Sequence, residues 1–116
     1  KTEPWFEWHY TPRAITFEQA LDEFSALFES IIKEQIQGKR VILPLSGGLD
    51  SRTQAVALSV IGADVHSYSY EFKNGYKETK IAEQIATSCG FDFQSYTIDN
   101  GYLWGVIDDL AQLNGC

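Results

Sequence analysis

The chain carries the stretch VILPLSGGLDS at residues 41–51. Its first five residues are an apolar run without alternation, which is typical of strands buried on both faces of a parallel sheet. Pro44 counts against a central strand because it cannot donate to the ladder, but it lies near the carboxyl end of the run. Residues 46–50 form a glycine-rich turn, and residues 51–61 are expected to form a mostly apolar and therefore buried helix. We therefore expect a strand, a tight turn and a helix in succession.

Strands and helices alternate on both sides of this stretch. Before it, Thr16 and Gln19 match a capping box that opens a helix over 17–37, whose apolar stripe we assign to the core and which Gly38 ends. The elements expected after it are a strand over 65–72, a helix over 78–89, a strand over 91–98 and a helix over 102–113. This order predicts βαβ units in an α/β parallel sheet. Right-handed crossovers give the strand order 3-2-1.

This topology leaves one side of the strand at 41–45 without a partner. Ligands of open α/β sheets bind beyond the carboxyl ends of strands, where the strand order reverses. The glycine-rich turn lies at that point. An apolar strand with a bare edge is an aggregation hazard. We therefore expect residues beyond Cys116 to add strands in the intact protein. In this chain alone we expect either that something else covers the edge or that the edge is poorly ordered.

The turn itself has the composition of an anion cradle. Gly47 and Gly48 let backbone amides approach an anion, while Ser46 and Ser51 add hydroxyl donors. The N-terminus of the following helix points at the same place. No Lys follows the glycines, so the turn is not a Walker A loop. Asp50 would repel a phosphate unless a cation lay between them, which implies Mg²⁺. The structural alternative is a tight turn with Asp50 or Ser51 as the helix N-cap.

The motif SGGLDS after an apolar strand resembles the pyrophosphate loop (PP-loop) of the N-type ATP pyrophosphatases. Within that group the chain resembles the asparagine synthetase family, in its C-terminal synthetase domain. The resemblance extends to the aromatic-rich N-terminus, to the short basic segment at 38–40 and to the expected strand over 65–72, which contains HSYSY at residues 66–70. It implies a Rossmann-like fold of the adenine nucleotide alpha hydrolase type, of which this chain would be the N-terminal half.

The resemblance also implies site residues and a reaction. The β,γ-phosphates of ATP would be held by the loop, which comprises Ser46, Gly47, Gly48, Leu49, Asp50 and Ser51. Asp50 would bind Mg²⁺, and the adenine side would be bordered by Pro44, Leu45 and Tyr70. In this family a substrate carboxylate attacks the α-phosphate, pyrophosphate leaves, and ammonia displaces AMP from the acyl-adenylate. The resemblance implies a glutaminase domain that supplies the ammonia, and the sequence leaves open whether the parent protein uses glutamine or free ammonia.

Two substitutions depart from the family pattern. Arg52 replaces a small residue, and its cation either reaches phosphate or faces solvent. Glu71 replaces a common Gly on the adenine side. Both leave the acceptor acid open, as aspartate or another carboxylate. The second acidic, glycine-rich loop of the family would lie beyond Cys116, so we expect the 116-residue chain to be inactive alone. The expected organisation is an aromatic arm over 1–15 and an incomplete ATP pyrophosphatase domain over 16–116.

Composition restricts the possible partners. The chain has 9 Lys and Arg against 16 Asp and Glu, a net charge of −7, which argues against nucleic acid. No apolar stretch approaches about 18 residues, so no membrane span is expected. Two cysteines make no disulfide framework, which fits a cytoplasmic protein.

His9 and His66 have no third partner that could complete a metal site, so we interpret them as structural or surface groups. The aromatic arm could stack bases, but an arm packed on the domain is the favoured interpretation.

Two other functions stay open. The chain could belong to another PP-loop ATP pyrophosphatase, although a tRNA-modifying relative would predict a basic surface or paired cysteines. It could instead be a non-catalytic nucleotide-binding or interaction module that retains only the loop. A downstream acidic, glycine-rich loop would distinguish a catalytic parent from a binding module.

Overall fold

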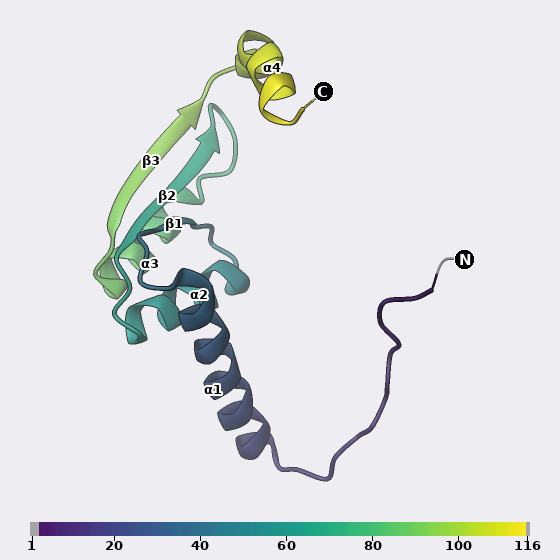
Figure 1. The fold of residues 1–116 in the computed structure, drawn as a ribbon. Coiled ribbons are helices and arrows are strands. Elements are labelled where there is room, and N and C mark those ends of the chain that lie inside the picture. Colours follow the sequence, from purple (N-terminus) through teal and green to yellow (C-terminus); the bar gives the residue numbers. More distant parts are fainter. Residues whose placement is uncertain (1–2, 116) are drawn as a thin grey trace.

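The computed structural model describes residues 3–115 and shows a three-stranded parallel sheet with four helices (Figure 1). The elements in chain order are α1 (Phe17–Ile36), β1 (Val41–Pro44), α2 (Leu49–Val60), β2 (Val65–Phe72), α3 (Thr79–Cys89), β3 (Asp92–Ile98) and α4 (Tyr102–Leu113). The sheet order is β1-β2-β3, so the expected α/β parallel sheet is confirmed. Element ends differ from the expected ones by two residues at most.

Pro44 is accommodated because of the direction in which its backbone nitrogen points. Val41 N donates to Asp64 O at 2.9 Å and Leu45 N donates to Tyr68 O at 2.7 Å. Alternate residues of β1 therefore direct their N–H groups toward β2. The nitrogen of Pro44 falls between them and faces the free edge, where no ladder bond is lost. The objection that Pro44 raised against a strand is thereby resolved.

The strands end at different heights. β1 pairs only with residues 65–68 of β2, whereas residues 69–72 of β2 pair with β3 alone. The carboxyl end of β2 therefore extends past β1. Among the residues that the structure describes, this overhang leaves the edge of β2 that faces β1 unpaired at residues 69–72, beside the turn that follows β1.

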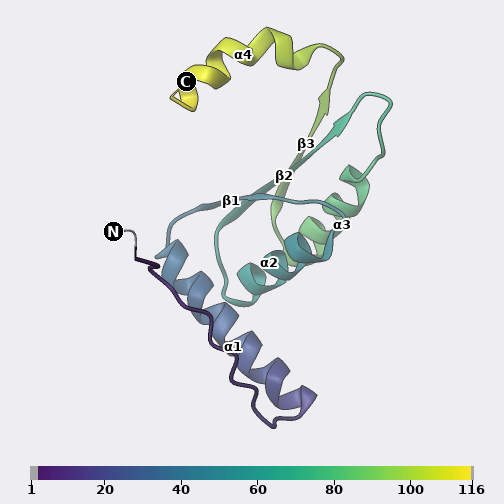
Figure 2. The ribbon, with the colours of Figure 1, turned by 90° about the vertical axis from the view of Figure 1, so that its right-hand side faces the viewer.

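α2 and α3 lie against the same face of the sheet (Figure 2). The buried residues on that side are mostly small or aliphatic, and they are Leu43, Leu45, Ala55, Ala57, Leu58, Val65, Ala82 and Ala86. Alternate residues of β2 that point the other way, Tyr70 and Phe72, are exposed. In the described part of the chain, the core therefore lies on one face of the sheet only.

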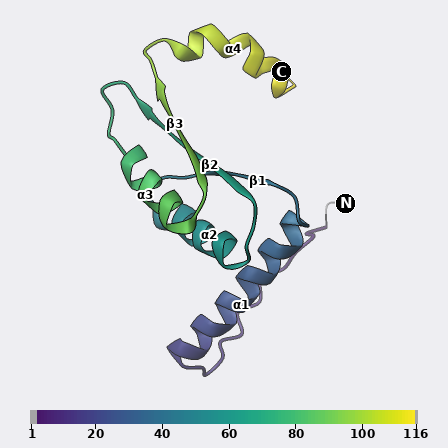
Figure 3. The ribbon, with the colours of Figure 1, turned by 90° about the vertical axis from the view of Figure 1, so that its left-hand side faces the viewer.

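The apolar stripe of α1 is not the core that its periodicity predicted. Ile32 is its single buried residue, and Phe28 and Ile36 are partly buried. Its N-terminal half projects beyond the sheet (Figure 3), so Phe24 and Leu27 are exposed. The prediction for α2 was also too broad. Its buried residues are Ala55, Ala57 and Leu58, while Val56 and Val60 face outward.

Residues 3–15 form an extended arm without helix or strand. Trp5 is 96% exposed and Trp8 92%, so the prediction that the arm packs on the domain is wrong. Its anchor is a hydrogen-bonded ion pair between Arg13 and Glu23 of α1, which raises the pKa of Arg13. No helix among residues 3–115 is long and apolar enough to cross a membrane.

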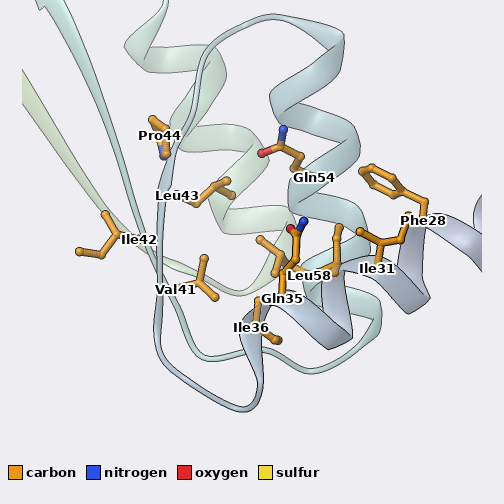
Figure 4. Close-up of a pocket in the computed structure, with 11 residues that line it drawn as sticks. Phe28, Ile31, Gln35, Ile36, Val41, Ile42, Leu43, Pro44, Gln54 and Leu58 are labelled. Atoms are coloured by element: carbon orange, nitrogen blue, oxygen red, sulfur yellow. The ribbon is translucent and has the colours of Figure 1, made fainter. Parts of the chain in front are cut away.

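The free edge of β1 borders an apolar groove. β1 has one neighbouring strand within the described chain, as predicted. The groove has a volume of about 440 Å³ and lies between the C-terminal half of α1, β1 and α2 (Figure 4). Ile42, on this strand, is 70% exposed. The expected cover for this edge is therefore not found among residues 3–115.

The capping box of α1 gives a first testable prediction. Gln19 N donates to Thr16 Oγ1 at 3.2 Å, and Thr16 N donates to Gln19 Oε1 at 3.0 Å. We expect Thr16→Ala to lower the free energy of unfolding by about 1 kcal/mol, because an orphan amide loses its acceptor. Urea denaturation measures the change. Thr53→Ala is the matched control, because Thr53 lies inside a helix and its hydroxyl donates to Leu49 O within the same helix. An equal loss in both variants would contradict the capping role.

Candidate functional site

The glycine-rich turn connects β1 to α2 at the carboxyl end of the sheet. α2 begins at Leu49, two residues before the expected Ser51, so Asp50 and Ser51 lie in its first turn. The N-cap is Gly48, with extended backbone and no side-chain capping bond. The structure therefore keeps the tight turn of the structural alternative, but neither Asp50 nor Ser51 is the N-cap of the helix. The first amides of α2 point out of the helix end with no side chain to satisfy them.

Ser46 and Ser51 fix the shape of the turn. Their hydroxyl oxygens lie 3.0 Å apart, and Ser46 N donates to Ser51 Oγ at 3.2 Å. Gly48 N donates to Ser46 Oγ at 3.2 Å. The carbonyl oxygens of Ser46 and Gly48 each lie 3.3 Å from Ser51 Oγ. The two serines thus close the loop by a network centred on Ser51 Oγ.

The glycines matter for the space they leave rather than for their backbone angles. Neither Gly47 nor Gly48 has a positive φ. A Cβ at Gly48 would lie 3.2 Å from Ser46 Oγ, tight enough to displace the hydroxyl that receives the Gly48 amide. A Cβ at Gly47 would meet Ile81 Cδ1 at 3.4 Å, an ordinary contact. Gly48 is therefore the position at which a side chain would disturb the loop most.

The remaining loop side chains have different surroundings. Leu49 is 73% exposed, so its apolar side chain is not part of the core. Asp50 is exposed at the start of α2. Arg52 Nη2 donates to Gly47 O at 3.3 Å. The guanidinium therefore rests on the loop, which places a cation beside the carbonyl of the first glycine.

The residues present fit a phosphate-bound Mg²⁺ better than an independent metal site. Among residues 3–115, no group of three or more His, Cys, Asp or Glu side chains is placed to hold a metal ion. Asp50 is the single carboxylate in the loop. Mg²⁺ in phosphate sites is commonly held by one or two carboxylates together with phosphate oxygens and water. The donor set therefore suits an ion that arrives with a phosphate ligand.

A cavity of about 430 Å³ opens from the loop along the overhang of β2. It brings together Pro44, Leu45 and Tyr70, which the resemblance had grouped on the adenine side, with Ser46 of the loop. Glu71, which the sequence analysis had also placed on the adenine side, lines the cavity as well. Sequence reasoning missed four further lining residues, which are Ser69, Phe72, Tyr76 and Glu78. The volume and the mixture of aromatic walls with a few polar groups are typical of small-molecule sites.

The far wall of the cavity depends on a tight turn at Asn74 and Gly75. Asn74 has a φ of 74°, and Gly75 N donates to Phe72 O at 2.7 Å. A Cβ at Gly75 would lie 3.1 Å from that oxygen. The turn brings Tyr76 back beside β2. The Asn-Gly pair, a common turn signal, was the available sequence signal for this wall.

Glu71 is held in place at the tip of β2. Thr79 Oγ1, at the N-terminus of α3, donates to Glu71 Oε2 at 2.7 Å. Glu71 is partly buried and lines the cavity. Both groups lie next to the first turn of a helix, where a negative charge is favoured. The departure from the family pattern therefore places an ordered carboxylate in the cavity wall.

Residues 23–113 match the sequence model of the family described as asparagine synthase. The chain belongs to the asparagine synthase family. It also shares its fold with two solved structures. One is a glutamine-dependent NAD⁺ synthetase from Acinetobacter baumannii in complex with ADP, with a TM-score of 0.55 and 24% identity. The other is an NH₃-dependent NAD synthetase from Campylobacter jejuni, with a TM-score of 0.52 and 18% identity. The family match confirms the predicted family, and the likeness to these two structures confirms the predicted Rossmann-like fold.

The chain covers only part of these proteins. It spans 21% of the A. baumannii structure and 42% of the C. jejuni structure, while 89% and 85% of this chain are aligned. A separate match, 40% identical over 55 residues, is to the ATP synthase subunit delta of Thermobifida fusca. That match covers 47% of this chain and 20% of the curated protein. Membership of the family rests on the match over residues 23–113.

Proposed function

We propose that this chain is the nucleotide-binding portion of an ATP-dependent ligase of the asparagine synthase family. The observation that carries the proposal is the cavity that runs from Ser46 of the loop to Tyr70 on the β2 overhang. Phosphates bind at the loop, which presents the first-turn amides of α2 and the serine hydroxyls. The nucleoside lies across Pro44 and Leu45 toward Tyr70. Support also comes from the ADP complex of the related A. baumannii synthetase.

The loop residues have an electrostatic role in this proposal. A substrate carboxylate attacks the α-phosphate, and pyrophosphate leaves as the acyl-adenylate forms. Negative charge develops on the leaving group, where the amides, Ser46, Ser51 and an Mg²⁺ at Asp50 stabilise it. Ammonia, supplied by a glutaminase domain of the parent protein, then displaces AMP. The acceptor is a small-molecule carboxylate, which is aspartate in an asparagine-forming enzyme.

The proposal is tested by titrating the ¹⁵N-labelled chain with Mg-pyrophosphate and then with Mg-ATP. We expect saturable amide shifts at Gly47, Gly48 and Ser51 with both ligands. Shifts along residues 69–72 are expected with ATP alone, because only ATP carries a nucleoside into the cavity. A well-dispersed spectrum that no ligand changes would contradict nucleotide binding by this chain.

Asp50 gives a prediction specific to the metal. We expect Asp50→Asn to weaken pyrophosphate binding in Mg²⁺ at least fivefold, because a neutral amide is a poorer ligand for Mg²⁺. In EDTA the same variant should bind pyrophosphate no worse than the wild type, since the repulsion between carboxylate and phosphate is removed. Asp109→Asn in α4 is the matched control and should change neither value. Equal weakening with and without Mg²⁺ would contradict a role for Asp50 toward the metal.

A further inference from the structure

The cavity is lined by the carboxylate of Glu71, which has no role in the proposed binding of phosphates. Glu71 lines the wall along the β2 overhang, and its Oε2 accepts the 2.7 Å bond from Thr79 Oγ1. A carboxylate has two oxygens with about four acceptor positions, and Thr79 occupies one of them. Glu71 can therefore accept further hydrogen bonds while its orientation stays fixed by Thr79.

The position of Glu71 relative to the loop indicates which group of a ligand would donate hydrogen bonds to its carboxylate. β1 and β2 are parallel neighbours, and the anion loop follows β1 while Glu71 stands at the carboxyl end of β2. In dinucleotide-binding βαβ units, an acidic residue placed in this way, roughly 20 residues after the glycines, bonds the ribose hydroxyls. The reason is geometric, because a nucleotide whose phosphates lie at the first helix end extends its ribose across the tip of the next strand.

We infer that Glu71 is a specificity-determining residue that reads the 2′- and 3′-hydroxyls of a ribonucleotide. The inference rests on the proposed function, because it requires phosphates at the loop. Hydroxyl hydrogens donate to the free positions of the carboxylate. A ligand without these hydroxyls leaves the partly buried carboxylate without its partners, which costs binding free energy. A ligand with a phosphate on either hydroxyl is repelled by the charge of Glu71.

The experiment compares three probes on the full chain in Mg²⁺, namely pyrophosphate, ATP and 2′,3′-dideoxy-ATP. Pyrophosphate reports the loop alone, because it has no ribose. We expect the wild type to bind ATP at least tenfold more tightly than the dideoxy nucleotide. Glu71→Gln retains an oxygen for Thr79 but loses the charge, and we expect it to reduce this ratio at least threefold with unchanged pyrophosphate affinity. Glu71→Ala should bring the ratio close to one.

Two carboxylates serve as controls. Glu83→Gln, on α3 and outside the cavity lining, should leave all three affinities unchanged. Glu78→Gln, which lines the same cavity, should leave the ratio near that of the wild type. The inference is overturned if the wild type binds ATP and dideoxy-ATP equally, or if Glu78→Gln rather than Glu71→Gln lowers the ratio. If pyrophosphate does not bind, the proposed function and the inference that rests on it are both overturned. If pyrophosphate binds but the wild type binds ATP and dideoxy-ATP with equal affinity, the inference alone is overturned.

Discussion

Ser51→Ala is expected to weaken Mg-pyrophosphate binding by about 10- to 100-fold. Ser51 Oγ is the centre of the loop network, since it accepts from Ser46 N and lies 3.0 Å from Ser46 Oγ. Its removal leaves the amide of Ser46 without an acceptor and frees the turn to open. When an anion binds, the hydroxyl hydrogen of Ser51 is expected to turn from the loop carbonyl oxygens to the anion. The substitution removes this donor, and hydrogen bonds to charged groups contribute about 1.5–3 kcal/mol. Isothermal titration calorimetry with Mg-pyrophosphate measures the change.

Ser59→Ala provides the matched control for Ser51. Ser59 lies at the other end of α2, and its hydroxyl donates to Cys89 O at 3.0 Å. Both substitutions remove one hydroxyl that is hydrogen-bonded to backbone from the same helix. Pyrophosphate affinity should fall in Ser51→Ala and stay at the wild-type value in Ser59→Ala. Equal affinities in the two variants would mean that the loop does not bind the anion through Ser51.

The elements and the position of the loop could be predicted because local signals agreed with the tertiary arrangement. Thr16 and Gln19 fixed the start of α1, and both capping bonds are present. The alternation of strands and helices left only one reasonable sheet order. Pro44 seemed to conflict with a strand, and its acceptability depends on which edge its nitrogen faces. That direction follows from the register of β1 against β2, which no single stretch of sequence specifies.

The cavity could be predicted only in part because it depends on where neighbouring strands end. Pro44, Leu45 and Tyr70 were grouped from the resemblance, and the structure brings them to one cavity. Tyr76 and Glu78 reach it because β2 extends past β1 and the turn at Gly75 folds back. Strand overhang is a relation between two segments far apart in the chain. The sequence pattern of either segment alone carries no record of it.

The burial of α1 and α2 was predicted too broadly for a related reason. Periodicity shows that a helix has an apolar face, but it does not show how much of that face has a partner. α1 meets α2 only near its C-terminal end, where Ile32 is buried, and its stripe is otherwise exposed. The groove of about 440 Å³ beside β1 continues this exposed stripe. The same apolar residues thus mark core at one end of α1 and uncovered surface at the other.

Leu58→Ala is expected to lower the free energy of unfolding by about 2–5 kcal/mol. Leu58 is 4% exposed in a core whose other members are four alanines and four larger aliphatic residues, so its truncation removes apolar contacts and leaves a space in the core. Domains of this kind are stabilised by about 5–15 kcal/mol in total, so the loss is a large fraction of that. A decrease of this size also lowers Tm by more than about 8 °C in a domain of roughly 100 residues. Urea denaturation followed by circular dichroism measures the change.

Leu113→Ala is the control that separates the stability loss caused by truncating a buried leucine from that caused by truncating an exposed one. Leu113 lies at the end of α4 and is 82% exposed, so its truncation should change the free energy of unfolding by less than about 0.5 kcal/mol. α2 carries the loop at its N-terminus and Leu58 near its C-terminus, where Leu58 belongs to the buried core cluster. At temperatures where the Leu58→Ala variant is still folded, Mg-pyrophosphate affinity should therefore stay close to the wild-type value. A stability loss as small as that of Leu113→Ala would show that the Leu58 side chain is not held in a packed core.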